Sequence, residues 1–186
     1  MAAKPPKVVL DEGAVARAVG ALESGILERN PQRTRLAVVG IHTGGVHLAR
    51  RIHKTLERAS RVDIPFGMLD ITLYRDDLDA GRHKPVVKST QIGFNVADRD
   101  VILVDDVLFT GRTVRAALDE IVDFGRPRSI QLAVLIDRGH RELPIQPDFK
   151  GVDVATDRED RIEVRFHEAD GRDEVLLIPF SSGAKS

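Results

Sequence analysis

The chain has 186 residues, of which 42% are hydrophobic and 31% charged, and its formal net charge is −1. The near-neutral net charge argues against non-specific nucleic-acid binding. The apolar runs are too short for a membrane span of roughly 20 residues. The absence of cysteine excludes disulfides and thiolate metal sites. We therefore expect a single domain over residues 1–186 that acts in the cytoplasm without a membrane partner.

The first part of the chain predicts two helices and two strands. Helical spacing of apolar residues predicts a helix from Asp11 to about Arg29, with Asp11 as its N-cap. The run Leu36 to Ile41 predicts a buried strand, followed by a turn at His42–Gly45. Ile64 to Tyr74 predicts a second strand or a hairpin arm. The helix between these strands has a buried stripe of Leu48, Ile52 and Leu56, and its residues facing water are Arg50, Arg51, Lys54, Glu57 and Arg58.

The second part of the chain repeats this alternation and ends differently. Val101 to Val104 and Ile130 to Ile136 are continuous apolar runs that predict buried strands. Between them, Thr113 to Phe124 predicts a helix that ends before a glycine. Ile162 to Phe166 and Val175 to Ile178 predict a terminal hairpin. The buried face of the helix is expected to comprise Val114, Ala117, Leu118, Ile121 and Val122.

Buried strands that alternate with amphipathic helices are typical of an α/β fold, in which a parallel sheet is covered by helices on both faces. In such folds ligands bind beyond the carboxyl ends of the strands. The segments that follow Ile41, Val104 and Ile136 are therefore the predicted site, and each carries polar residues.

The stretch VILVDDVLFTGRT, Val101 to Thr113, is the most informative motif. A predicted strand brings Asp105 and Asp106 to the carboxyl edge of the sheet, and residues 110–113 open a helix whose amides and dipole favour a phosphate. Two adjacent carboxylates need donors or cations, which ribose hydroxyls and a magnesium ion would supply. Ribose 5-phosphate fits this arrangement; the alternative is a strand end with two solvated aspartates and an ordinary helix start.

The turn His42-Thr43-Gly44-Gly45 follows the first predicted strand. Its glycines would expose backbone amides that suit pyrophosphate. A plain turn between a strand and a helix is the alternative interpretation, but the neighbouring phosphate motif favours a binding role.

Three segments together resemble the bifunctional pyrimidine operon attenuator and uracil phosphoribosyltransferase family, PyrR. They are the stretch from Val101 to Thr113, LDITLYRDD (Leu69 to Asp77) and GRPRSIQLAVLIDRGHRELPI (Gly125 to Ile145). The resemblance implies a type I phosphoribosyltransferase fold with a small hood and a C-terminal hairpin. It implies transfer of ribose 5-phosphate from phosphoribosyl pyrophosphate (PRPP) to uracil with Mg²⁺, giving UMP and pyrophosphate. It also implies binding to the leader mRNA of pyrimidine operons and assembly into homo-oligomers, dimers or larger.

The resemblance also implies roles for individual residues. Asp105 and Asp106 would be catalytic and would bind the ribose hydroxyls, and Leu69 to about Lys88 would be a flexible loop that closes over PRPP. The hood and terminal strands would occupy about residues 137–180. No protein side chain is assigned as a metal ligand. The predicted PRPP loop is Asp105, Asp106, Val107, Leu108, Phe109, Thr110, Gly111, Arg112 and Thr113; the predicted pyrophosphate site is Thr43, Gly44 and Arg75; the predicted base site is Asp137, Arg138 and Gly139; and His140 and Arg141 are hood residues or RNA contacts.

Two of these assignments keep an alternative. Arg75 is equally well explained as a solvated surface arginine, and His140 as a partly buried, hydrogen-bonded histidine.

The sequence departs from the family mainly where RNA contacts are expected. Gly44 stands where family members usually have arginine, Gly20 and Ala21 replace a usual Thr-Arg pair, and Gln146 replaces a basic residue. From Asp153 to Glu174 there are nine acidic and four basic residues. Because each lost phosphate contact weakens RNA binding, the enzyme is favoured over the regulator. The alternatives are an RNA-binding attenuator with vestigial catalysis and a purine phosphoribosyltransferase.

Overall fold

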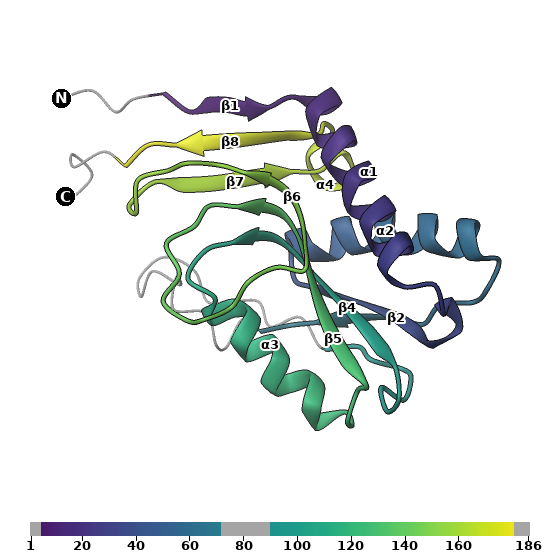
Figure 1. Cartoon of the computed structure of the whole chain (residues 1–186). Coiled ribbons are helices and arrows are strands. Elements are labelled where there is room, and N and C mark those ends of the chain that lie inside the picture. The colour runs from purple at the N-terminus through teal and green to yellow at the C-terminus, as the bar shows by residue number, and fades with distance from the viewer. Residues whose placement is uncertain (1–4, 72–89, 181–186) are drawn as a thin grey trace.

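The structure, a computed structural model, describes residues 5–71 and 90–180. Its larger sheet is parallel, with the strand order β3-β2-β4-β5-β6 (Figure 1). Its smaller sheet is antiparallel, with the order β1-β8-β7, and lies beyond one end of the larger sheet. The strands are β1 Lys7–Leu10, β2 Leu36–Ile41, β3 Phe66–Leu69, β4 Asp100–Leu108, β5 Ser129–Asp137, β6 Phe149–Asp153, β7 Arg161–Arg165 and β8 Glu174–Ile178.

Helices cover both faces of the larger sheet, as the alternation predicted. Helices α1 (Glu12–Arg29) and α2 (Gly44–Ser60) pack on one face and α3 (Arg112–Asp123) on the other. A single 3₁₀ turn, η1 (Arg33–Arg35), precedes β2, and the short α4 (His167–Asp170) joins β7 to β8. The predicted α/β fold with a parallel sheet and a terminal hairpin is confirmed.

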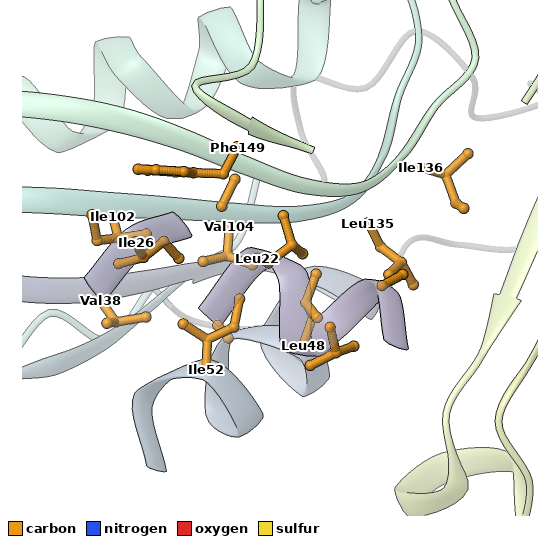
Figure 2. Close-up of a cluster of buried hydrophobic side chains, with 14 of the residues drawn as sticks. Leu22, Ile26, Val38, Leu48, Ile52, Ile102, Val104, Leu135, Ile136 and Phe149 are labelled. Atoms are coloured by element: carbon orange, nitrogen blue, oxygen red, sulfur yellow. The ribbon is translucent and has the colours of Figure 1, made fainter. Parts of the chain in front are cut away.

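The alternation of side chains along the strands divides the core in two. Val38, Ile102 and Leu135 point to the side of α1 and α2, where they pack with residues such as Leu22 and Ile52 (Figure 2). Their strand neighbours Val39, Leu103 and Val134 belong to the second cluster, under α3. Because successive residues of a strand face opposite sides, strands buried on both faces must be apolar throughout, which is why they appear as continuous apolar runs.

Several elements occur where the sequence predicts them. Helix α1 begins after Asp11, whose carboxylate accepts a 2.8 Å hydrogen bond from the amide of Ala14. Strand β2 has the predicted bounds, and β7 and β8 pair as the predicted hairpin. The segment predicted over Ile64 to Tyr74 forms β3, which is parallel to β2, and its Met68 also pairs with Gln91 in an isolated antiparallel bridge. The last residues of the predicted segment lie outside the described part of the chain.

Other elements differ from the prediction. Strand β4 continues to Leu108, so the two aspartates lie in its last part, where it is still paired with β5. Val122 was predicted on the buried face of α3 but is 58% exposed. Arg51, predicted to face water, is bonded to two carboxylates. Strands β1 and β6 were not predicted. Strand β1 pairs with β8, which is distant in sequence, and β6 pairs with β5 and forms one edge of the larger sheet.

Among residues 5–71 and 90–180, no helix is both long and apolar enough to cross a membrane.

Candidate active site

A cavity of about 980 Å³ opens at the carboxyl ends of β2 and β4. One side is formed by the starts of α2 and α3 and by the end of β4. The opposite side is formed by residues of β7 and α4, which we call the hood wall (residues 161–170). The cavity therefore lies between the two sheets, at the edge where ligands of parallel α/β folds bind.

The acid pair lies on the floor of this cavity. Asp105 is 5% exposed, its Oδ1 accepts a 3.0 Å hydrogen bond from the amide of Asp106, and both residues line the cavity. The start of α2 packs directly against them. A Cβ on Gly45 would lie 2.6 Å from the carbonyl oxygen of Val104, and one on Gly44 would lie 2.1 Å from Oδ2 of Asp106. At Gly45 the added atom would meet backbone, so this close approach requires glycine, whereas at Gly44 it would meet only the side chain of Asp106.

Helix α3 begins on the other side of the acid pair. Gly111, its N-cap, has φ 92°, a conformation that glycine adopts without strain. The predicted PRPP loop, Asp105 to Thr113, lines the cavity in full. The free amides and partial positive charge of a helix start favour anions. Two helix starts thus flank two carboxylates in one cavity, so anionic groups and hydroxyl groups can be bound side by side.

The predicted pyrophosphate residues are partly placed. Thr43 and Gly44 line the cavity next to Asp106. Helix α2 already begins at Gly44, so the predicted turn is shorter than His42–Gly45. Arg75 and most of the predicted flexible loop, from residue 72 onward, lie outside the described residues.

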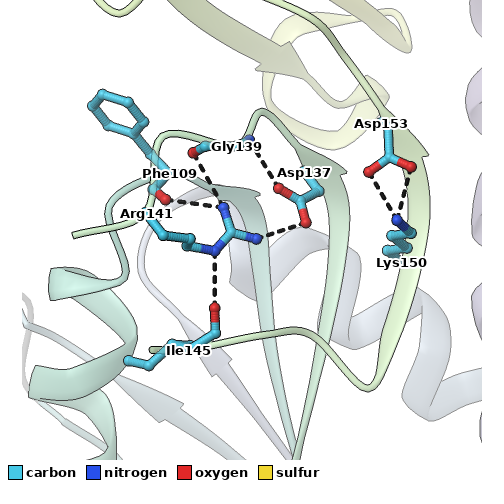
Figure 3. Close-up of polar contacts among 7 residues, drawn as sticks. All are labelled: Phe109, Asp137, Gly139, Arg141, Ile145, Lys150 and Asp153. Atoms are coloured by element: carbon cyan, nitrogen blue, oxygen red, sulfur yellow. Dashed lines mark hydrogen bonds and ion pairs between the residues drawn. The ribbon is translucent and has the colours of Figure 1, made fainter. Parts of the chain in front are cut away.

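Asp137, Arg138 and Gly139, at the end of β5, were predicted to bind the base. In the structure the contacts of Asp137 and Gly139 are internal to the fold. Asp137 accepts from Nη2 of Arg141 at 2.6 Å and from the amide of Gly139 at 2.9 Å (Figure 3). Burial by itself would raise the pKa of Asp137, but the hydrogen bonds from Arg141 and Gly139 outweigh it and lower this pKa. In the described part of the chain, neither Asp137 nor Gly139 is among the residues that line the cavity.

Arg138 does line the cavity, and its side chain makes several contacts inside the fold. It is 7% exposed, and its guanidinium lies 3.9 Å from the centre of the Phe109 ring. It donates to Oγ1 of Thr156 at 3.3 Å and to the carbonyls of Asp157 and Arg158 at 3.1 and 3.2 Å. Burial lowers the pKa of Arg138 from its ordinary value. Arg138 therefore connects the PRPP loop to the segment that leads into the hood wall.

His140 and Arg141 also have contacts inside the fold. Nε2 of His140 lies 2.8 Å from the carbonyl oxygen of Thr156, as expected for a partly buried, hydrogen-bonded histidine. Arg141 donates to the carbonyls of Phe109, Gly139 and Ile145 as well as to Asp137 (Figure 3). The RNA role of both residues stays a prediction.

Three features of the cavity were not predicted from the sequence. His47 lines it from the first turns of α2, and Glu142 lines it from the segment after β5. Glu142 accepts from Nε of Arg112 at 2.7 Å and from Arg158, and its amide donates to the carbonyl of Thr110 at 2.9 Å. The hydrogen bond from Arg112 lowers the pKa of Glu142.

The third unpredicted feature is the position of the hood wall. The resemblance implied a hood within about residues 137–180 and the hairpin pattern indicated strands here, but nothing local to these residues indicated that β7 faces the acid pair across the cavity. Strand β7 is the outer strand of the smaller sheet, so within residues 5–71 and 90–180 one of its edges is not paired with another strand.

Residues 7–169 match the phosphoribosyl transferase domain family. The chain is 55% identical to the Bifunctional protein PyrR of Roseiflexus sp., over 92% of this chain and 94% of the relative. It is 53% identical to the protein of the same name from Clostridioides difficile, over 91% of this chain and 96% of the relative. The chain belongs to the PyrR family of phosphoribosyltransferases.

Solved structures agree with this membership at the level of the fold. A hypoxanthine phosphoribosyltransferase from Trypanosoma cruzi, solved as a ternary substrates complex, superposes with a TM-score of 0.70 over 93% of this chain and 95% of that one, at 16% identity. A purine phosphoribosyltransferase from Pyrococcus horikoshii superposes with a TM-score of 0.58 over 78% and 86%, at 25% identity. The chain is thus a phosphoribosyltransferase of the PyrR family on a fold that purine enzymes share.

Proposed function

We propose that the chain transfers the 5-phosphoribosyl group of PRPP to uracil, forming UMP and pyrophosphate. The observation that carries this proposal is the acid pair of β4, held between the starts of α2 and α3 in one cavity. The start of α3 suits the 5-phosphate, Asp105 and Asp106 suit the ribose hydroxyls, and the start of α2 suits pyrophosphate.

These positions correspond to the charges that develop in the reaction. When the bond from the anomeric carbon to pyrophosphate breaks, positive charge grows on the ribose ring and negative charge on the leaving group. Asp105 and Asp106 stabilise the first, and the amides at Thr43–Gly45 stabilise the second. The nitrogen of uracil attacks the same carbon from the side of the hood wall and loses its proton to the leaving pyrophosphate or to water. No strong general base is therefore required of the protein.

The hood wall supports the proposed base site. Ile162, Glu163 and Val164 of β7 line the cavity, and the unpaired edge of this strand offers backbone N–H and C=O groups. Uracil presents two carbonyls with an N–H between them, a pattern that such an edge can match. Arg138 holds the chain just before β7, so its part in base binding includes positioning that edge.

Magnesium is proposed to enter with PRPP. In the described part of the chain no three histidine, cysteine or acidic side chains are grouped to hold a metal ion. The cavity nevertheless offers the carboxylate of Asp106 next to the proposed pyrophosphate site, and Mg²⁺ is commonly held by one or two carboxylates together with substrate phosphates. When bound, the ion would supply positive charge for the leaving group.

The experiment that tests the proposal is turnover by the pure protein. Uracil, PRPP and Mg²⁺ should give UMP and pyrophosphate in equal amounts. Hypoxanthine, guanine and orotate in the same assay test the base preference. Turnover with a purine and not with uracil would replace the proposed substrate, and turnover with none of the four bases would refute the proposal.

A second function, as a regulator that binds RNA, is favoured by the name that the relatives share, which describes them as bifunctional. We propose that the chain binds the leader mRNA of pyrimidine genes in a UMP-dependent manner, more weakly than members that keep the basic residues replaced here by Ala21 and Gln146. Filter binding at low salt, with and without UMP, measures this affinity, and a flat titration would refute it.

We also propose a cytoplasmic homo-oligomer. Light scattering coupled to size exclusion would give the mass in solution. A monomer at all concentrations would refute the assembly.

A further inference from the structure

Arg51 lies outside the cavity and joins the two halves of the molecule that enclose it. It projects from α2, the helix whose first turn carries Thr43 and Gly44. Its guanidinium donates to both oxygens of Asp173, at 2.6 and 2.7 Å, and to both oxygens of Glu168, at 2.9 and 2.5 Å. Glu168 belongs to α4, and Asp173 directly precedes β8. A single side chain thus connects the core to the end of the hood wall.

The same arginine also supports a residue that lines the cavity. Its guanidinium lies 5.1 Å from the centre of the Phe166 ring, which is 1% exposed. His47, one turn before Arg51 on α2, packs against the other part of this ring with centroids 6.0 Å apart. Phe166 is followed by Ala169 and Asp170, which line the cavity as well. The position of this part of the wall relative to α2 therefore depends on Arg51.

The hood wall is held by an arginine at each end. Arg138 binds the carbonyls of Asp157 and Arg158 before the wall begins, and Arg51 binds Glu168 and Asp173 at its end. The two arginines come from different parts of the core. Arg138 is next to the PRPP loop, whereas Arg51 is on the helix that begins at the proposed pyrophosphate site.

We propose that Arg51 is a positioning residue that holds the hood wall at a fixed distance from α2 and thereby sets the affinity for UMP, whose base would lie against this wall. This inference rests on the proposed function, because it takes UMP as the product bound in the cavity. Arginine suits the role because its planar fork binds both oxygens of two carboxylates at once, whereas lysine acts as a point charge. PRPP carries no base and would contact the acid pair and the starts of α2 and α3, so its binding should depend little on Arg51.

The test compares the wild type with Arg51→Gln, Arg51→Lys and a matched control, Arg128→Gln. Arg128 also pairs with a buried carboxylate, that of Asp100, at 3.0 Å, but this pair lies at the amino ends of β4 and β5, whereas the cavity opens at the carboxyl ends. Replacing Arg128 therefore removes an ion pair without changing the contact between the hood wall and the core. Titration calorimetry gives the Kd of PRPP with Mg²⁺ and the Kd of UMP for each protein, and thermal melting reports the fold.

We expect Arg51→Gln to raise the Kd of UMP roughly 10- to 100-fold, as a displacement of about 1 Å in a site can do. The Kd of PRPP should change less than about twofold, Arg51→Lys should be intermediate, and Arg128→Gln should bind both ligands as the wild type does. An unchanged Kd for UMP in folded Arg51→Gln would overturn the inference, as would equal weakening of PRPP and UMP.

Two further outcomes are also decisive. If neither Arg51 variant folds, the residue serves the fold and the inference fails. If the wild type binds PRPP but shows no turnover with any base, the proposed reaction fails, while the calorimetric comparison still decides the role of Arg51.

Discussion

In the larger sheet every residue of β2 is buried, with α1 and α2 on one face and α3 on the other, whereas in the smaller sheet β7 has one buried residue among five. The larger sheet is held by apolar packing. The smaller sheet adds ion pairs, among them those of Arg165 with Glu163 and Glu174 and the connection from Arg51. Apolar packing fixes the acid pair on a rigid edge, and directional charge pairs place the opposite wall of the cavity. Substitutions in the two regions should therefore show separately what the acid pair contributes to catalysis, what apolar packing contributes to stability, and what the ion pairs contribute to holding the hood wall.

The largest effect on activity is expected from the acid pair at the carboxyl edge of the larger sheet. Replacing both Asp105 and Asp106 by asparagine keeps their shape and removes the negative charge that faces the ribose. We expect kcat/KM to fall roughly 10²- to 10³-fold or more, since preorganised electrostatic groups at reacting centres contribute on this scale. Thermal melting within a few degrees of the wild type would show that the fold is kept. Unchanged kinetics would contradict the role of the pair.

The two glycines at the start of α2 separate packing from chemistry. A Cβ at Gly45 meets backbone, the carbonyl of Val104 and Cα of Asp105, so Gly45→Ala should lower the free energy of unfolding by about 1–3 kcal/mol. A Cβ at Gly44 meets only the side chain of Asp106, which can turn away. Gly44→Ala should therefore weaken PRPP binding at little cost in stability. Urea denaturation and PRPP titration check both, and equal stability losses would contradict this distinction.

The pH dependence of stability tests the charge pairs of the hood. The hydrogen bond from Arg51 lowers the pKa values of Asp173 and Glu168 from their ordinary 3.8 and 4.5. A lowered carboxylate pKa stabilises the fold above the unfolded-state pKa, and this contribution is lost as the pH falls through the folded-state value. The stability difference between wild type and Arg51→Gln should therefore be full at pH 7 and shrink below about pH 4. Urea denaturation across this range measures it; a constant difference would contradict the ion pairs.

The smallest effect is expected at Val122, whose side chain is 58% exposed on α3. Val122→Ala should change the free energy of unfolding by less than about 0.5 kcal/mol. The same substitution at Val114, which is 2% exposed on this helix, should cost roughly 2 kcal/mol because it leaves a cavity in the core. Similar losses at the two positions would mean that α3 packs differently from the structure.

The sequence by itself determined the features that depend on neighbours along the chain. The N-cap at Asp11, the bounds of β2, the acid pair and the helix that starts after Gly111 all follow from residues within a few positions of one another. The resemblance to the PyrR family also came from such local segments. Periodicity failed at Val122, because the contact of α3 with the sheet follows Val114, Ala117 and Ile121, and Val122 lies to one side of this narrow stripe.

Only the tertiary structure decided how distant segments meet. The pairing of β1 with β8 joins residues at opposite ends of the chain, and the contacts of Arg51 with Glu168 and Asp173 span more than a hundred positions. The sequence shows a charged residue on a helix and acids near a hairpin, and many such pairs never meet. Whether they meet depends on the packing of the whole molecule, because a charge pair is short-ranged and its partners are brought together by the burial of other residues.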